Sequence, residues 1–250
     1  MKKTVLSIIV ILCFGLTVSA QTKEVKLANV AYINGNYELA AQQYEDIIAT
    51  VGVAPELYYN LGNTYYKLNE VGLAILNYER ALRLDPKNSD AQFNLEMAQL
   101  KVVDNIVDTP TFFLGKWIDN FVKFLSSNQW FYLSITFFIV CLIFAFLFIF
   151  GPTRQFRKMS FYFAVAMIIA SSFSVVFANV RKQHVENHNE AIITVGVVSV
   201  KSSPDKSGTD LFQLHEGTKV QVKSTLGSWT EIKLGNGNVG WLEADNISRI

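Results

Sequence analysis

The fold of the first half of the chain is decided by residues 55–88, which have the sequence PELYYNLGNTYYKLNEVGLAILNYERALRLDPKN. Aromatic, aliphatic and small side chains recur there at helical spacing, at Tyr58, Leu61, Gly62, Tyr65, Ala74, Tyr78 and Ala81. The spacing predicts two packed helices, because the small residues let the helices approach closely and the tyrosines fill the space beside them. Pro86 ends the second helix, since proline has no backbone N–H to donate.

This pattern resembles the tetratricopeptide repeat (TPR), a family of two-helix units that repeat every 34 residues. Moving back by one period places similar side chains on equivalent positions, namely Leu27, Ala28, Ala40, Tyr44 and Ile47. We therefore predict an all-α TPR domain over residues 21–108, with repeats at about 21–54 and 55–88. Residues 89–108 are interpreted as a capping helix or a truncated third repeat, since repeat arrays need a terminal helix with a polar outer side.

The TPR resemblance implies a concave groove, lined by the first helix of each repeat, that binds peptides. Asn29 and Asn63 are equivalent across the period, as are Tyr32 and Tyr66. Asparagine amides can hydrogen-bond an extended peptide backbone, and tyrosine offers contact area with a polar tip. The candidate groove residues are Asn29, Tyr32, Tyr59, Asn63, Tyr66, Lys67 and Asn94. The alternative is that they are ordinary packing or solvated positions.

The N-terminus has the organisation of a secretory signal peptide over residues 1–20. Lys2 and Lys3 precede a short apolar run, and small residues precede Gln21, which places cleavage after Ala20. The apolar run is shorter than the roughly 20 residues that a membrane span needs. The sequence thus predicts export.

Two longer apolar segments predict a transmembrane hairpin. Residues 130–150 and 161–180 carry no charged side chain, and each is long enough to cross a bilayer. The predicted loop between them, residues 151–160, contains Arg154, Arg157 and Lys158 and no acidic residue. The positive-inside rule places this loop in the cytoplasm, so both soluble parts are expected in the periplasm of a two-pass inner-membrane protein.

Residues 109–127 predict an amphipathic helix before the hairpin. Its aromatic side chains recur at helical spacing, with polar side chains between them. Such a helix is typical of the lipid headgroup region. The alternative is a helix that packs on the TPR cap.

Residues 190–250 predict a small all-β barrel of five short strands. Alternating Val220–Val222, the strand-like Trp229–Leu234 and the hairpin signal Asn236-Gly237 carry this prediction. The segment resembles the bacterial SH3 family in Ser203-Pro204, LHEGTKVQV (214–222), Gly227-Ser228-Trp229 and Gly240-Trp241. Phe212, Trp229 and Trp241 are candidates for an aromatic platform that takes a proline-rich or cell-wall peptide; the alternative is that the tryptophans are core residues.

The residue composition argues against catalysis. The only cysteines, Cys13 and Cys141, lie in apolar segments, so the soluble parts have no thiol nucleophile and no Cys-based zinc site. We find no phosphate-binding Gly loop and no nucleophile elbow, and the His184/His188 pair is better interpreted as part of a hydrated connector. We expect no enzyme activity, no catalytic residue, no cofactor and no metal; a net charge of +1 gives no case for nucleic acid.

The whole order of segments resembles BatE-type members of the Bacteroides aerotolerance (Bat) operon family. Signal peptide, TPRs, membrane hairpin with a basic loop, and SH3-like domain follow one another as in that family. The resemblance implies a scaffold beside von Willebrand A-type Bat membrane proteins and a MoxR-type ATPase, linked to aerotolerance or envelope stress. The sequence therefore predicts an adaptor in contact with membrane lipid, and the alternative is a peptidoglycan-binding protein that acts through the SH3-like domain.

Overall fold

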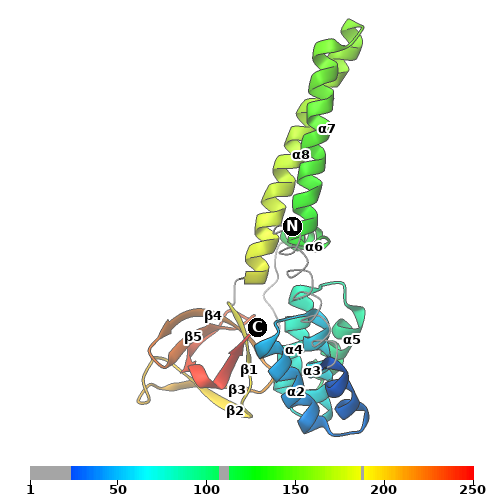
Figure 1. Ribbon diagram of the computed structural model, residues 1–250. Helices are drawn as coiled ribbons and strands as arrows, with labels where there is room; N and C mark the ends of the chain where they lie inside the picture. Colours follow the sequence, from blue (N-terminus) through cyan, green and yellow to red (C-terminus); the bar gives the residue numbers. More distant parts are fainter. Residues whose placement is uncertain (1–23, 107–112, 187–188) are drawn as a thin grey trace, which may run out of the picture. The chain divides into compact units, whose positions relative to one another are not determined.

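The computed structural model describes residues 24–106, 113–186 and 189–250 (Figure 1). The chain divides into two compact units, and each is described by itself. The first unit combines Met1–Thr109 with His188–Ile250, and the second is Pro110–Asn187. The predicted signal peptide lies outside the described residues.

The first unit begins with paired helices, as the 34-residue period predicts. Residues 24–33 are helical, and the helices that follow are α2 (Tyr37–Thr50), α3 (Pro55–Lys67), α4 (Val71–Leu84) and α5 (Ser89–Gln99). Gly62 of α3 lies against Tyr78 of α4, where an added Cβ would come within 2.7 Å of the tyrosine ring. Glycine is therefore required at this crossing, and the predicted TPR architecture is confirmed.

The second part of the first unit is an antiparallel sheet with the strand order β3-β2-β6-β5-β4-β1-β7. Its elements are β1 (Glu190–Ile193), β2 (Val197–Lys201), β3 (Asp210–His215), β4 (Lys219–Leu226), β5 (Trp229–Lys233), β6 (Val239–Glu243), the 3-10 helix η1 (Ala244–Asn246) and β7 (Ile247–Arg249). Gly237 takes a left-handed φ of 95° in the β5–β6 hairpin, as the Asn-Gly pair predicts.

The predicted number of five strands is wrong, because the described residues 189–250 form seven. The first apolar stretch of this part forms two strands, β1 and β2, which residues 194–196 separate. Residues 247–249 form a further strand that pairs with β1. β1 and β7 are both short, and they pair with each other across most of the domain. The residue pattern along the sequence therefore does not mark either one clearly as a separate strand.

An apolar core joins the helical and the β parts of the first unit. Ile192 of β1 and Ile250, which follows β7, are buried in the same cluster as Ile75 and Tyr78 of α4 and Leu95 of α5. The backbones also approach closely. A Cβ at Gly72 of α4 would lie 2.9 Å from the carbonyl oxygen of Ile193, and one at Gly217 would lie 2.7 Å from Val102.

Polar contacts border this shared core. Arg80 Nη2 of α4 donates to the carbonyl of Arg249 at 2.7 Å, and Arg83 donates to the carbonyl of Ile250. Lys219 Nζ lies 3.0 Å from the carboxylate of Glu79 and 3.0 Å from that of Glu190. These contacts connect α4 to β7 and to β4, and Lys219 of β4 also reaches Glu190 of β1.

Asp104, in the segment after α5, fastens the β3–β4 turn. Its carboxylate accepts from the backbone N–H of His215 at 2.7 Å and from the Thr218 hydroxyl at 2.6 Å, and it lies 2.7 Å from His215 Nδ1. Burial alone would raise the pKa of Asp104, but the hydrogen bonds from Thr218 and His215 outweigh it and lower the pKa. The ionised carboxylate therefore contributes to the stability of this unit.

The second unit is a helical hairpin with a short helix before it. Its helices are α6 (Phe113–Lys123), α7 (Ser127–Phe150) and α8 (Arg154–Glu186). Ser126 and Gln129 form a capping box at the start of α7. α7 and α8 pack antiparallel through Ser134 and Ser171, whose hydroxyls lie 3.3 Å apart, and through stacked Phe144 and Phe163.

The predicted helix over 109–127 lies partly outside the described residues. Its described part, α6, ends at Lys123, before the predicted end, and packs on the base of the hairpin. The ring centroids of Phe121 and Trp130 lie 5.5 Å apart, and Trp130 Nε1 donates to the carbonyl of Val122 at 3.0 Å. α6 thus belongs to the same compact unit as the hairpin. Its place in the lipid headgroup region stays a prediction.

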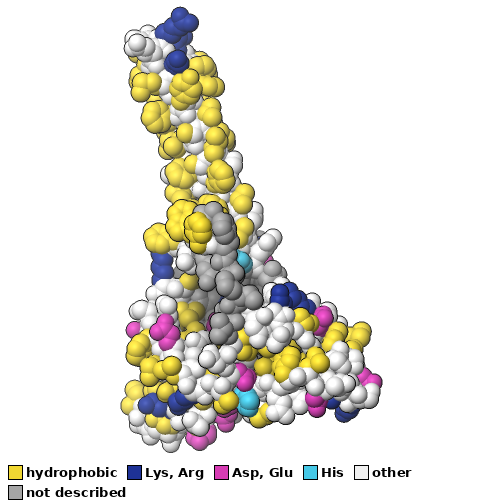
Figure 2. All heavy atoms as spheres, turned by 180° about the vertical axis from the view of Figure 1, so that it is seen from behind, with side chains coloured by type: hydrophobic (Ala, Val, Ile, Leu, Met, Phe, Trp, Pro, Cys, Tyr) yellow, Lys and Arg dark blue, Asp and Glu magenta, His cyan; other side chains and the backbone are white. Residues whose placement is uncertain are grey.

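The hairpin helices are both long and apolar enough to cross a membrane, which indicates membrane association. Hydrophobic side chains cover the visible face of the hairpin, and Lys and Arg side chains gather at its turn (Figure 2). The predicted loop over 151–160 is mostly helical, because α8 begins at Arg154. Arg154, Arg157 and Lys158 therefore lie in the first turns of α8 and not in a loop.

We predict that Asp104→Asn lowers the free energy of unfolding of the first unit by about 1–3 kcal/mol, because it weakens hydrogen bonds to a carboxylate. The pKa of Asp104 is lower in the folded than in the unfolded chain, so its contribution is present above about pH 4 and is lost as pH falls through the lowered pKa. Urea unfolding of the full chain in detergent, followed by circular dichroism at several pH values, measures both effects.

The control for this prediction is Asp245→Asn, which changes an exposed carboxylate in η1. It should leave the stability within about 0.5 kcal/mol of the wild type. Equal stabilities of the Asp104 and Asp245 variants at pH 7 would contradict the role of Asp104.

Candidate functional site

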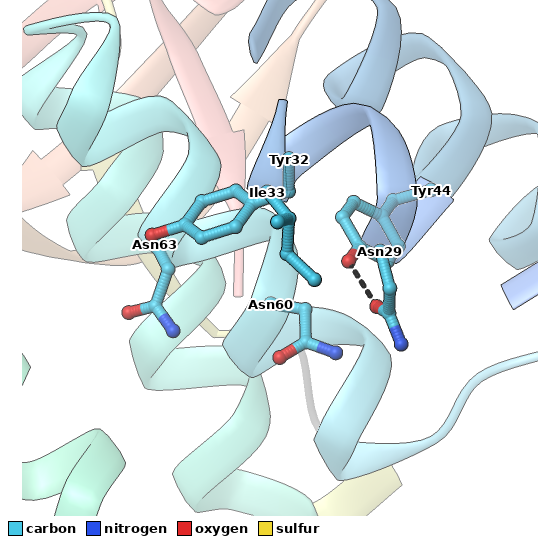
Figure 3. A pocket seen from close by; sticks show the side chains of 6 residues that line it. All are labelled: Asn29, Tyr32, Ile33, Tyr44, Asn60 and Asn63. Atoms are coloured by element: carbon cyan, nitrogen blue, oxygen red, sulfur yellow. Dashed lines mark hydrogen bonds between the residues drawn. The ribbon is translucent and has the colours of Figure 1, made fainter. Parts of the chain in front are cut away.

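A cavity of about 260 Å³ opens between the first helical residues, α2 and α3 (Figure 3). It is lined by three asparagines, two tyrosines and one isoleucine: Asn29, Tyr32, Ile33, Tyr44, Asn60 and Asn63. None of these side chains carries a charge. The cavity thus offers amide and phenol groups together with one aliphatic side chain.

One hydrogen bond of this region recurs with the period of the repeat. The Tyr44 hydroxyl donates to Asn29 Oδ1 at 2.5 Å, and the Tyr78 hydroxyl donates to Asn63 Oδ1 at 2.8 Å. Both tyrosines are buried, while both asparagines are half-buried. Each buried tyrosine hydroxyl therefore holds the side-chain oxygen of an asparagine. The amide nitrogen of that asparagine is left on the groove side.

Burial keeps both phenols protonated. It is the largest cause that raises the pKa of Tyr44 to about 12, and burial likewise raises the pKa of Tyr78. A protonated phenol remains a donor, so the asparagine must present its oxygen to the tyrosine. The Nδ2 amides of Asn29 and Asn63 then remain as donors, and neither has a hydrogen-bond partner among the residues that the structure describes.

The amide nitrogens of Asn29 and Asn63 can donate hydrogen bonds to a ligand. In Figure 3 the amide nitrogen of Asn29 points away from the hydroxyl of Tyr44. An amide N–H₂ group held in place donates to carbonyl oxygens, which an extended peptide presents at regular intervals. The arrangement is suited to binding a backbone and offers no acid, base or nucleophile.

Only some of the predicted groove residues line the cavity. Asn29, Tyr32 and Asn63 line the cavity. Asn94 Nδ2 of α5 donates to Asn63 Oδ1 at 2.7 Å and lies 3.4 Å from the Tyr59 hydroxyl, so these two residues extend the same network.

Tyr66 and Lys67 lie outside the cavity. The ring of Tyr66 lies under Lys101, whose Nζ is 4.1 Å from the ring centroid. Lys67 is exposed at the end of α3 and is not among the cavity residues.

Sequence reasoning missed Ile33, Tyr44 and Asn60 as cavity residues. The 34-residue period contains a signal for Asn60, since it is equivalent to the predicted Asn94. The sequence predicts Tyr44 only as a packing residue. Its spacing marks it as buried, and spacing alone does not show that its hydroxyl also holds a groove residue.

The SH3-like part separates the three predicted aromatic residues. Phe212 packs against the buried core of the sheet. Trp229 and Trp241 instead alternate with the buried Thr230 and Leu242, so both lie half-buried on the outer face of β5 and β6. The predicted three-residue platform is corrected to a pair of tryptophans, because Phe212 lies on the inner face of its strand.

The two tryptophans are neighbours on that outer face. Trp229 is opposite Glu243, and Trp241 is opposite Glu231, which places the two indoles on a diagonal of the β5–β6 ladder. Trp241 also pairs with Lys201 of β2, whose Nζ lies 2.9 Å from Asp210. Neither tryptophan belongs to the buried core, so the outer face presents aromatic surface beside charged groups.

Comparison with known families agrees with both parts of this unit. Residues 55–88 match the family described as Tetratricopeptide repeat, and residues 196–248 match the family described as Bacterial SH3 domain. No curated protein gives a significant match to the chain.

These matches identify two domain types within the chain. The chain combines a TPR domain, which indicates protein partners, with a bacterial SH3 domain, which indicates cell-wall peptide binding and an envelope location. Both domain types are typically non-catalytic. Among the described residues, no group of three His, Cys, Asp or Glu side chains could hold a metal ion.

We predict that Tyr78→Phe lowers the free energy of unfolding by about 0.5–1.5 kcal/mol, since it removes one buried hydrogen bond and no packing volume. Tyr44→Phe should cost a similar amount, because it removes the equivalent bond in the first repeat. Thermal unfolding of the full chain in detergent measures both. Tyr37→Phe is the control, since this half-buried tyrosine makes no side-chain hydrogen bond to the part of the chain that the structure describes. A loss of stability as large as that of Tyr78→Phe would refute the assignment.

Proposed function

We propose that this chain is a membrane-anchored scaffold whose TPR groove binds an extended segment of a partner protein. The observation that carries the proposal is the repeated tyrosine–asparagine pair, which fixes the Asn29 and Asn63 amides toward an uncharged cavity. The Asn29 and Asn63 amides are donors that repeat with the period of the TPR. An extended peptide presents its backbone carbonyls at regular intervals, so it suits such a row of donors.

The hairpin supplies the anchor in this proposal. The basic side chains in the first turns of α8 face the cytoplasm under the positive-inside rule, which puts the TPR and SH3-like parts in the periplasm. A cleaved signal peptide over residues 1–20 is consistent with that topology. The likeness to BatE-type proteins names von Willebrand A-type Bat membrane proteins as the partners to test, in an adaptor role linked to aerotolerance or envelope stress.

The shared core determines how the proposal must be tested. Removal of residues 21–108 would also remove α4, on which Ile192 and Ile250 of the β part are buried. Such a deletion would destabilise the SH3-like part. A loss of binding could then come either from the missing groove or from the unfolded SH3-like part. Point substitutions in the groove avoid this problem.

We predict that Asn29→Ala combined with Asn63→Ala removes protein partners that crosslink to the full chain in native membranes. Pull-down after crosslinking, quantified by mass spectrometry, should show at least a tenfold loss of those partners, because each lost hydrogen bond costs about 1 kcal/mol or more. Thermal unfolding of the double variant in detergent controls for its stability, and Gln42→Ala, at an exposed position, controls for surface change on α2.

Retention of the same partners by the double variant would contradict the groove as their binding site. The hairpin or the SH3-like part would then be the contact. Absence of von Willebrand A-type proteins from a set of partners that does depend on the groove would remove the Bat assignment alone.

The outer-face tryptophans favour a second function, binding of cell-wall peptide by the SH3-like part. Indole surface beside Glu231, Glu243 and Lys201 suits a ligand with both apolar and charged groups. The proposal does not need the TPR groove, so the two functions are separable.

We predict that full chain in detergent co-sediments with purified cell-wall sacculi, and that Trp229→Ala with Trp241→Ala abolishes most of this retention. Val239→Ala is the matched control, because Val239 is exposed on the same face of β6. Equal retention of wild type and the tryptophan variant, or no retention of the wild type, would exclude this function.

A further inference from the structure

The helix α8 uses one row of small side chains to pack against α7 (Figure 1). The Ser171 hydroxyl donates to the carbonyl of Ser134, and the carbonyl of Ala178 accepts from the Ser127 hydroxyl, so this side of α8 faces α7. The buried residues of the row follow one another at the three- and four-residue steps of a helix packing face, at Ser160, Ser171, Ser174 and Ala178.

A second row with the same steps runs along α8 and is exposed. Its residues are separated alternately by four and three positions, at Val165, Ile169, Ser172, Val176 and Asn179. They follow the buried row by one or two positions, which is a rotation of about 150° on a helix of 3.6 residues per turn. The exposed row therefore lies on the side of α8 away from α7. We call these five residues the outer seam.

A hollow of about 230 Å³ lies at the centre of the outer seam. Four of its lining residues have the helix positions i, i+3, i+4 and i+7, and a fifth flanks them: Ile169, Ser172, Phe173 and Val176, with Ile168 beside them. Four residues with this spacing form the hole that receives a side chain of a facing helix. Ser172 is the smallest of them, and a small residue at such a place lets a second helix approach closely.

The end of the outer seam is polar. Asn179 is exposed, and its side chain makes no hydrogen bond with the part of the chain that the structure describes. The helix α6 does not cover it, because α6 meets α8 at Phe177, whose ring centroid lies 5.7 Å from that of Phe121. Lipid tails offer neither a donor nor an acceptor to an amide. The outer seam is therefore suited to an occupant that is apolar along most of its length and offers both groups beside Asn179.

A second copy of this chain has these properties. Two copies in one membrane have the same orientation, so a two-fold axis parallel to α8 brings each seam residue opposite its own counterpart. An amide carries a donor and an acceptor, so two Asn179 side chains satisfy each other. A polar residue of this kind also fixes the register of paired helices. Residues 161–180 carry no charge, so the two copies do not repel each other there.

We propose that the outer seam of α8 is the contact between two copies of this chain within the membrane. The inference rests on the hairpin as the anchor in the proposed function and does not involve the TPR groove. The dimer carries two grooves on one scaffold, which strengthens binding to a partner that itself offers two segments, because the second segment binds at a high effective concentration.

The first test is disulfide crosslinking of the full chain in native membranes. Cys13→Ser and Cys141→Ser remove the chain's own thiols, and copper phenanthroline then joins introduced cysteines whose Cβ atoms approach within about 4.5 Å. Val176→Cys, in the outer seam, should give a covalent dimer of the chain. Val175→Cys is the matched control, because it changes the same residue type at a neighbouring exposed position outside the seam.

The second test measures the strength of the contact. Copies labelled with donor and acceptor fluorophores are placed in phospholipid vesicles, and energy transfer is followed as the protein-to-lipid ratio falls. Ser172→Trp fills the hollow and should raise the ratio at half-association at least tenfold. Asn179→Val should raise it about threefold or more, since it removes the interhelical hydrogen bonds. Val175→Trp, outside the seam, should leave it within about twofold.

Equal crosslinking at positions 175 and 176, or energy transfer that Ser172→Trp does not reduce, would overturn the inference. Crosslinking of Val176→Cys to a different protein would also overturn it and would assign the outer seam to a partner's helix. Carbonate extraction of the same membranes separates this failure from failure of the proposed function. A chain that stays in the membrane without forming dimers refutes the seam contact alone, whereas a chain that carbonate releases refutes the membrane anchor and the seam contact together.

Discussion

The contact between α4 and the β part is the constraint on which the first unit depends. Val71, Ile75 and Tyr78 of α4 are buried in one cluster with Ile192 of β1 and Ile250, which would otherwise be exposed on a small sheet. The approach is close enough that Gly72 and Gly217 have no room for a side chain. A two-repeat helical array and a sheet of short strands each bury little surface alone, so the shared core gives both a stability that neither supplies by itself.

This shared core gives the two candidate binding surfaces a fixed relation. The groove lies on the first helices of the repeats, and the tryptophans lie on the outer face of β5 and β6; neither surface is used by the core. A ligand on one surface is therefore held at a set position relative to a ligand on the other. Asp104, Lys219 and the two arginines of α4 maintain that relation through hydrogen bonds at the border of the core.

In the TPR part, the same repeated tyrosines both pack the helices and orient residues of the groove. Tyr44 and Tyr78 pack the helices together, and their hydroxyls also orient the asparagines. The same period then changes character at α5, where the position of Asn63 is taken by Met97. Packing residues are repeated because the fold needs them, whereas residues on the groove side are free to differ.

The sequence by itself determined the elements whose signals are local. The TPR helices follow from the 34-residue pattern around Gly62 and Tyr78, the two apolar helices follow from their length, and the β5–β6 hairpin follows from Asn236-Gly237. It also named Asn29, Tyr32 and Asn63 in the groove, because repeat equivalence is visible without coordinates. Only the tertiary structure decided that the helical and β parts share a core, that Phe212 faces inward while Trp229 and Trp241 face outward, and that β7 pairs with β1. These features depend on contacts between residues more than 50 positions apart in the chain, or on which face of a short strand meets a neighbour, and neither is encoded in the spacing of side chains along the sequence.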